Sequence, residues 1–483
     1  MKTFLFYDTE TTGLNPAFDQ VLTFAAIRTD TRLNEISREE IIVKLRPDIV
    51  PSPAAFLTHG LTPDILETGV TEYEAALKIH RLFNTPDTIS CGYNSLGFDD
   101  EFLRFLFYRN LLDPYSHQFA RGCSRMDMLP VTAIYRLFCD GILSWPHLAD
   151  GRGTLKLEYI SRENGFVTSG RAHEAMSDVE ALLALAKRFA GEHKIWAYVQ
   201  AFFDKKKEDM RILKLEAAHL PGNEPYRIGL MVSPSFGPQV NYMAPVLHLG
   251  GSLPYKNQSL WLRLDQDDLL SGTDANTGVY DFFVIRKRAG DQMLILPGLE
   301  RFWGRLTQEA QACCQKNLND IRDHFPLFLD TVLFHRQFKY PAIPDLDLDA
   351  ALYQDGFFSP AEKQDMVLFH TMLAKEKVTG ACELSSQRLR RMARRVISRN
   401  FEVDLPGNDG YASHLKRLSG RSAEGRVIGY KNDTKLTCSD AVAQLRDMKT
   451  DVTGSESDAA QERILKWLKH YITELSAKLA QPF

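Results

Sequence analysis

Hydrophobic patterns divide about the first 190 residues into short strands and helices. The runs that predict strands are residues 3–7, 21–29, 39–45 and 88–91. Because the first three follow one another directly, an antiparallel start to the sheet is favoured. Apolar residues at helical spacing predict helices over residues 71–83, 99–110 and 177–190. The charged run 204–209 then marks a boundary. The pattern predicts a mixed α/β domain over residues 1–192.

The rest of the chain has a different texture. Short β-like runs separated by Pro and Gly predict a smaller β-rich domain with some helix over residues 193–346. Those runs are residues 227–233, 259–264 and 292–296. Residues 347–483 have mostly helical periodicity, with an Arg-dense helix at 386–399 and a final helix at 457–479. We expect the Gly-, Ser- and Asn-rich residues 406–429 to be a flexible insertion in this helical domain.

Composition excludes several classes of protein. Of the 483 residues, 44% are hydrophobic, which rules out global disorder, and 58 Lys and Arg against 62 Asp and Glu give a net charge of −4. If this protein binds nucleic acid, it must do so through a local basic groove. The seven cysteines include no CxxC pair, and no apolar run is long enough for a signal peptide or a membrane span. We therefore expect a cytoplasmic protein with no membrane association.

Two acidic residues end the first predicted strand, in the run Asp-Thr-Glu-Thr-Thr-Gly. Asp8 and Glu10 are two positions apart on an extended chain, so their side chains point to the same side. Carboxylates this close repel one another and favour a hard cation such as Mg²⁺ or Mn²⁺ between them. An exposed acidic turn is the alternative, and for these two residues alone it is the more common explanation.

Two further acidic residues lie at the starts of predicted helices. Asp99 follows the predicted strand 88–91 and opens the next helix, where an N-cap role is the alternative. His173 and Asp178 stand at the entry to the helix 177–190, and both can face one site only if His173 lies in the loop or first turn. Taken alone, such a histidine is usually only a polar residue on the protein surface.

Taken together, these elements resemble the DEDD superfamily of 3′→5′ exonucleases, in the subgroup with a histidine in its last motif. The resemblance implies a ribonuclease H-like α/β fold with a mixed sheet. It also implies that Asp8, Glu10 and Asp178 bind two Mg²⁺ ions, for which Mn²⁺ would substitute, and that Asp99 completes the site. His173 would be the general base on the attacking water, which suits its ordinary pKa near 6.5. Two ions would stabilise the incoming and the departing oxygen of an in-line displacement.

The chain as a whole is similar to the bacterial exonuclease I family. The similarity rests on short runs along most of the length, at residues 24–30, 98–101, 107–110, 113–115, 155–158, 232–233, 236–237, 244–245, 352–353, 356–359 and 399–401. It implies an SH3-like β-rich domain and a helical C-terminal domain, which combine with the nuclease domain to form a basic channel for single-stranded DNA. It also implies a processive monomeric enzyme and a role in DNA repair and recombination. The sequence departs from the family at Lys156, where we expect Arg in a DNA contact, and in residues 406–429.

The resemblance also implies contacts to the substrate. Thr11 and the turn Gly60, Leu61 and Thr62 would hold the terminal 3′ nucleotide, although a plain turn before a helix is the alternative. Arg104 and Tyr115 combine a cation with a ring, as strand-binding proteins do, but either could belong to the core.

The Arg-dense helix has three interpretations. Arg388, Arg390, Arg391, Arg394, Arg395 and Arg399 cover more than one of its faces. They could form a solvated surface, a wall of the DNA channel, or a dock for the acidic C-terminal tail of single-stranded-DNA-binding protein, a partner that the resemblance implies. For the whole protein, an exoribonuclease and a non-catalytic strand-binding protein are the alternative functions, because contacts to a 2′-OH cannot be recognised in a sequence.

Overall fold

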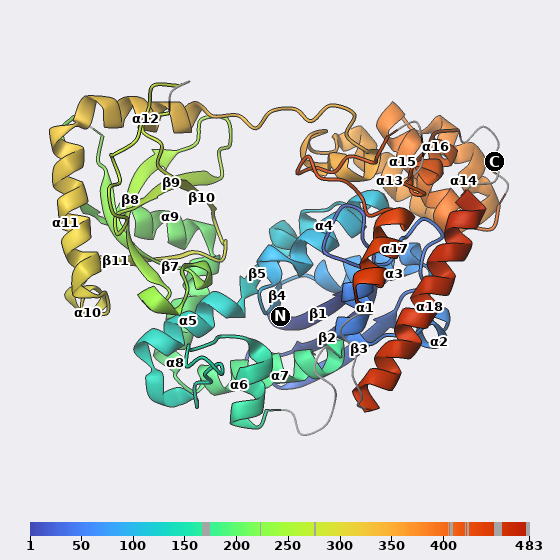
Figure 1. The fold of residues 1–483 in the computed structure, drawn as a ribbon, viewed down its shortest axis with the longest axis horizontal. Coiled ribbons are helices and arrows are strands. Elements are labelled where there is room, and N and C mark those ends of the chain that lie inside the picture. Colours follow the sequence, from blue (N-terminus) through green and yellow to red (C-terminus); the bar gives the residue numbers. More distant parts are fainter. Residues whose placement is uncertain are drawn as a thin grey trace.

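The computed structural model describes residues 1–166, 174–222, 224–274, 277–403, 405, 409–420, 422, 425–448 and 456–479. In Figure 1 the N-terminal domain lies between the β-rich domain and the C-terminal helices, and the linker after α12 spans the distance between the latter two. Within the described ranges, no helix has both the length and the apolar character needed to cross a bilayer.

The N-terminal domain is built on a five-stranded mixed sheet in the order β3-β2-β1-β4-β5. β1 is antiparallel to β2 and parallel to β4, and β4 is parallel to β5. The strands are β1 (Thr3–Thr11), β2 (Val21–Thr29), β3 (Glu35–Ile42), β4 (Thr88–Gly92) and β5 (Ser124–Asp127). The mixed α/β fold predicted from sequence is confirmed, with parallel strands added to the antiparallel start.

Helices cover both faces of this sheet. Side chains of β1 alternate between the two faces, so Phe4 and Phe6 pack in one core cluster and Leu5 and Tyr7 in another. The first cluster contains α5 and α7, and the second contains α3 and α4. The helices are α1 (Pro53–His59), α2 (Pro63–Glu67), α3 (Glu72–Phe83), α4 (Asp99–Arg109), α5 (Met128–Phe138), α6 (Leu157–Asn164), α7 (Ala175–Ala190), α8 (His193–Gln200) and α9 (Lys205–Leu213).

The β-rich domain contains a second, antiparallel sheet in the order β10-β9-β8-β7-β11, with β6 paired to β7. Its strands are β6 (Glu216–Ala217), β7 (Arg227–Val232), β8 (Met243–Gly251), β9 (Gln258–Arg263), β10 (Val284–Arg288) and β11 (Leu294–Pro297). The helices α10 (Glu300–Trp303), α11 (Gln308–Asp323) and α12 (Phe325–Gln337) follow. The SH3-like assignment and the boundary at residue 193 stay predictions; Trp196 and Val199 of α8 pack into the core of the first domain.

The C-terminal helices share a core with the first domain. Phe18, Phe56 and Tyr108 from the N-terminal part pack in one cluster with Phe369 and Leu468 from the C-terminal part. The helices are α13 (Pro360–Thr371), α14 (Ala374–Glu383), α15 (Gln387–Asn400), α16 (Asp409–Arg417), α17 (Cys438–Asp447) and α18 (Glu456–Leu479), after the short 3₁₀ helix η8 (Leu348–Tyr353). The longest of them, α18, runs beside α1 (Figure 1).

The prediction of a flexible insertion is wrong for part of residues 406–429. Residues Asp409–Arg417 form α16, and His414 on it is fully buried. The Gly, Ser and Asn residues of the run suggested a loop, but Tyr411, His414 and Leu418 lie at helical spacing and are buried.

Candidate active site

The acidic residues of β1 lie on the face of the sheet that α7 covers. Asp8 and Glu10 continue the series of Phe4 and Phe6, whose rings pack against α7, so strand alternation brings both carboxylates to the same side. Asp178 projects from the first turn of α7. Ligand oxygens of Asp8, Glu10 and Asp178 all lie within 4.8 Å of one another. We call these three residues and Asp99 the acidic cluster.

Asp99 reaches the cluster from the first turn of α4. The hydroxyl of Thr9, which lies between the two acids of β1, donates a hydrogen bond of 2.5 Å to the Asp99 carboxylate. The N-terminus of a helix favours negative charge, and both Asp99 and Asp178 occupy such a position. Thr9 was not predicted from the sequence, although its place between the two acids of a predicted strand was a visible signal.

Burial and neighbouring acids raise the pKa values of three carboxyl groups in the cluster. Burial and the charges of Asp99, Glu10 and Asp178 raise the pKa of Asp8 well above its ordinary value. Burial and the charges of Asp178 and Asp99 raise the pKa of Glu10 to about 8, and burial outweighs the Thr9 hydrogen bond and raises the pKa of Asp99 to about 7. In the described part of the chain, Asp8 and Glu10 form no ion pair with Lys or Arg. Such a site gains free energy by binding divalent cations through oxygen ligands.

A cleft of about 620 Å³ leads to the cluster between two domains. Asp8 and Asp178 line it from the first domain, together with residues 152–158 of the segment that leads into α6. Pro234, Pro238 and Tyr242 line it from the β-rich domain. Lys156, predicted to contact DNA, lines this cleft and is exposed. Asp8, Asp178 and Lys156 thus line the same cleft.

Known proteins match this arrangement in sequence. A family model for exonucleases matches residues 5–186, and the model of the exonuclease I C-terminal domain matches residues 346–475. Exodeoxyribonuclease I of Escherichia coli is 30% identical over 440 residues, which is 87% of this chain and 89% of that protein. This chain belongs to the exonuclease I family.

Solved exonuclease I structures share the fold over nearly the whole chain. Exonuclease I from Methylocaldum szegediense superimposes with a TM-score of 0.80 at 25% identity and covers 98% of this chain and 100% of that one. The zinc-bound complex of Escherichia coli exonuclease I with single-stranded DNA gives a TM-score of 0.79 at 25% identity, with the same coverage. The predicted ribonuclease H-like exonuclease domain and helical C-terminal domain are therefore confirmed.

The other residues predicted for an exonuclease I site are distributed as follows. His173 lies outside the described residues, so its role as general base stays a prediction. Thr11 is buried, and its hydroxyl donates to the Gly13 carbonyl at 2.7 Å. Gly60, with φ of 70°, caps α1, and Leu61 and Thr62 lead from it into α2. The amide of Ser52 donates to the Thr12 carbonyl at 2.8 Å and so ties the start of α1 to the end of β1.

Arg104 and Tyr115 lie together, but the guanidinium already has acidic partners. Arg104 pairs with Asp100 at 2.6 Å and with Glu101 at 2.5 Å, and its charge lies 6.0 Å from the centre of the Tyr115 ring. The Arg104 side chain is 6% exposed, whereas Tyr115 is partly exposed and packs edge-on against the exposed Phe357. Of this pair, Tyr115 is the one with a ring surface open to a partner.

The Arg-dense helix, α15, is partly buried. Arg395 pairs with Asp347 at 2.5 Å, Arg399 pairs with Asp349 at 2.5 Å, and both arginines are nearly inaccessible to solvent. The interpretations of a channel wall, a protein dock and a solvated surface are therefore wrong for these two residues. Arg391 is exposed and remains available for a partner. Sequence reasoning placed all six arginines outside because it could not see that acids 50 residues away would meet them.

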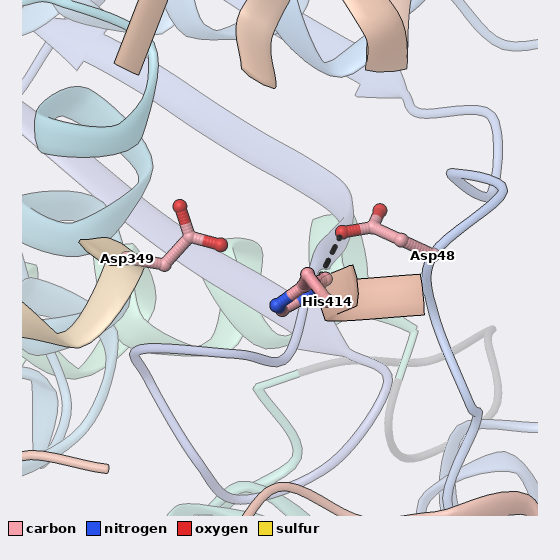
Figure 2. A group of neighbouring side chains, drawn as sticks. All are labelled: Asp48, Asp349 and His414. Carbon is pink, nitrogen blue, oxygen red and sulfur yellow. Dashed lines mark ion pairs between the residues drawn. The ribbon is translucent and has the colours of Figure 1, made fainter. Parts of the chain in front are cut away.

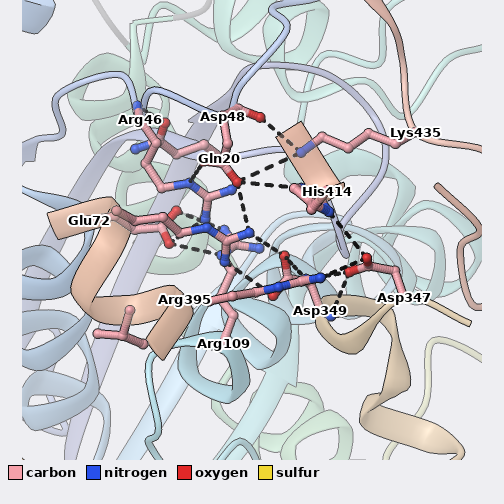
Figure 3. Close-up of polar contacts among 12 residues, drawn as sticks. Gln20, Arg46, Asp48, Glu72, Arg109, Asp347, Asp349, Arg395, His414 and Lys435 are labelled. Atoms are coloured by element: carbon pink, nitrogen blue, oxygen red, sulfur yellow. Dashed lines mark hydrogen bonds and ion pairs between the residues drawn. The ribbon is translucent and has the colours of Figure 1, made fainter. Parts of the chain in front are cut away.

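These two arginines belong to a buried network of acidic and basic side chains, which we call the interdomain network. Its members connect the first domain to the C-terminal helices and are Arg46, Asp48, Glu72, Arg109, Asp347, Asp349, Arg395, Arg399, His414 and Lys435. Figure 3 shows carboxylates and cationic groups interleaved along it. Burial alone would raise the pKa of Asp48, but the charges of Arg399, Arg46 and Lys435 outweigh burial and hold that pKa well below its ordinary value.

Three members of this network have the spacing of a metal site. Ligand atoms of Asp48, Asp349 and His414 lie within 4.8 Å of one another, and Figure 2 shows the three side chains converging. Arg399 lies between the two acids, 2.8 Å from Asp48 and 2.5 Å from Asp349. Since a guanidinium already supplies the positive charge there, we do not assign this group as a metal centre.

Proposed function

We propose that this protein is a divalent-metal-dependent 3′→5′ exonuclease that degrades single-stranded DNA to 5′-mononucleotides. The observation that carries the proposal is the acidic cluster, whose converging carboxylates lie at an accessible cleft in a chain of the exonuclease I family. The complex of the Escherichia coli relative with single-stranded DNA supports the choice of substrate. A processive mode and a role in DNA repair and recombination are part of the same proposal.

The cluster suits a pair of Mg²⁺ or Mn²⁺ ions. Asp8, Glu10 and Asp178 would hold them, and Asp99, fixed by Thr9, would complete the ligand set. Such ions, when bound, stabilise the negative charge on the incoming and departing oxygens of phosphodiester hydrolysis. The carboxylates supply oxygen ligands, burial and mutual repulsion raise the pKa values of Asp8 and Glu10, and Lys156 in the same cleft can neutralise a phosphate.

The test is a denaturing-gel time course on 5′-labelled single-stranded DNA with Mg²⁺, beside duplex DNA and RNA of the same sequence. We expect shortening from the 3′ end for single-stranded DNA only, and none with the Asp178→Ala protein. Degradation of RNA in preference to DNA would make the protein an exoribonuclease. No cleavage of any substrate, with Mn²⁺ as well, would leave a strand-binding protein.

We also infer that the enzyme works as a cytoplasmic monomer and that the acidic tail of single-stranded-DNA-binding protein docks on the exposed part of α15. Arg391 is the exposed cation that supports this partner. A labelled tail peptide should bind the wild type and lose affinity in Arg391→Ala. Unchanged affinity in that variant would remove the dock from the proposal, and sedimentation of the free protein tests the monomer.

A further inference from the structure

A buried carboxylate outside the acidic cluster holds the turn that leads to Asp99. Asp127 ends β5, is fully buried, and accepts four hydrogen bonds. The donors are the backbone amides of Asn94 at 2.9 Å, Leu96 at 3.0 Å and Leu129 at 2.9 Å, and the side-chain amide of Gln292 at 2.8 Å. Two of these donors, Asn94 and Leu96, belong to the segment between β4 and α4, so Asp127 holds that segment in place.

This segment determines where Asp99 lies. Asn94 adopts a left-handed conformation with φ of 61°, which Asn tolerates better than most non-glycine residues and which sets the direction of the turn. The short 3₁₀ helix η1 (Ser95–Gly97) follows, and α4 begins two residues later with Asp99. A shift of the turn would therefore move Asp99 relative to Asp8 and Thr9.

The fourth donor comes from another domain. Gln292 lies in the turn between β10 and β11, and its amide nitrogen donates both to Asp127 and, at 3.0 Å, to the side-chain oxygen of Asn94. That turn is itself anchored, because Glu208 of α9 accepts from the Gly290 amide at 2.9 Å and pairs with the buried Lys287 at 2.6 Å. The Gln292 side chain thus extends from an anchored turn of the β-rich domain and contacts Asn94 and Asp127 beside the acidic cluster.

We propose that Gln292 is a positioning residue through which the β-rich domain holds Asp99 in the geometry that the acidic cluster needs for divalent cations. The path runs from Gln292 to Asp127, to the backbone of Asn94 and Leu96, and on to Asp99. This inference rests on the proposed exonuclease function for its kinetic consequence, but not for its effect on metal affinity. The accessory domain then contributes to the metal site as well as lining the cleft.

The main test is Gln292→Ala, with Mn²⁺ affinity measured by calorimetry and with kcat and KM measured on single-stranded DNA. We expect Mn²⁺ affinity and kcat to fall about tenfold, the lower end of what partners behind metal ligands contribute. KM should stay close to wild type, and the thermal midpoint of the metal-free protein should fall only modestly, because Asp127 keeps its three backbone donors. The control is Gln266→Ala, an exposed amide of the same domain whose side chain contacts Asp265.

Two further variants test the path. Gly97→Ala would place a methyl group 3.2 Å from the Gln292 side-chain oxygen, which should displace the amide and weaken Mn²⁺ binding in the same direction, by less. In an Asp127→Asn background, Gln292→Ala should add little, because its main acceptor has already been altered. Gly97→Ala keeps the test available if Asp127→Asn does not fold.

The proposal is overturned if Gln292→Ala binds Mn²⁺ and turns over DNA within a factor of two of wild type. It is equally overturned if the effects of Gln292→Ala and Asp127→Asn simply add. A wild-type protein that binds Mn²⁺ but cleaves no oligonucleotide would refute the proposed function, and the comparison of Mn²⁺ affinities would still decide the inference.

Discussion

The acidic cluster and the interdomain network both gather buried carboxylates, yet the pKa values of their acids move in opposite directions. In the cluster, burial and neighbouring acids raise the pKa values of Asp8, Glu10 and Asp99. In the network, the arginines outweigh burial and lower the pKa values of Asp48 and Asp349. Crowded acids therefore do not by themselves identify a metal site. The decisive property is whether the protein supplies its own cations.

Removing an acid from the cluster should abolish activity without weakening the fold. Asp8→Asn takes away a metal ligand and about 4 kcal/mol or more of transition-state stabilisation, so we expect a loss of roughly a thousandfold or more in kcat. The metal-free protein should be as stable as wild type or more so, because a repulsive charge has been removed. Single-turnover rates and thermal unfolding in EDTA measure the two effects. A destabilised Asp8→Asn protein would contradict this contrast.

Removing an acid from the network should do the reverse. Asp349→Asn leaves Arg395 and Arg399 buried with one fewer partner, and breaking a buried pair costs about 3–5 kcal/mol. Urea unfolding at neutral pH measures this cost, and the surviving folded protein should still bind Mn²⁺. The control is Asp345→Asn, at an exposed position four residues earlier, which should change the stability by less than about 0.5 kcal/mol. Equal effects of the two substitutions would show that the network contributes little.

The two regions should also respond to pH with opposite signs. Glu10, with a pKa of about 8 against an ordinary 4.5, retains a proton in the folded state that the unfolded chain has lost, so metal-free stability falls as pH rises from about 4.5 to 8. Glu72 has a pKa of about 2, because Arg109 and Arg46 outweigh burial, so its contribution is present above pH 4.5 and is lost as pH falls toward 2.

Substitution of each residue by Gln isolates these contributions. Glu10→Gln should gain stability relative to wild type between pH 5 and pH 8 in EDTA. The deficit of Glu72→Gln should shrink between pH 5 and pH 3. Thermal melts across these ranges give both slopes, and slopes of the same sign would refute the contrast.

The smallest expected effect is that of removing the cation Lys156 from the cleft. Lys156→Ala should lower the affinity for single-stranded DNA modestly and reduce the slope of log affinity against log salt by about one, because one phosphate contact is lost. The stability should not change, since Lys156 is exposed. Fluorescence anisotropy at several salt concentrations, with EDTA to prevent cleavage, measures the slope. An unaltered slope would place the strand away from Lys156.

The sequence was most informative where a pattern is local. Strand alternation placed Asp8 and Glu10 on one side, and helical periodicity located α3, α4 and α7 to within one or two residues. Edge strand β3 was predicted at residues 39–45 but spans Glu35–Ile42, because its exposed polar residues pair with β2 only through the backbone. β8 was not predicted, since Pro245 lies near its start and two glycines end it.

Contacts between distant segments could not be predicted from sequence. Arg395 and Arg399 were assigned to the surface because nothing near them in the chain indicates that Asp347 and Asp349 would enclose them. The same limit hid Asp127 and Gln292, which are 165 residues apart and meet only when two domains pack together. Charged and polar residues whose partners come from another domain follow no hydrophobic period, so the fold alone reveals them.

The most direct test of the contrast is a calorimetric titration of metal-free protein with Mn²⁺ for the wild type, Asp8→Asn and Asp349→Asn, at a temperature where all three are folded. We expect two ions to bind to the wild type and to Asp349→Asn, and binding to be lost or severely weakened in Asp8→Asn. Unchanged binding in Asp8→Asn, or its loss in folded Asp349→Asn, would contradict the assignment of the acidic cluster as the metal site and of the network as a structural element.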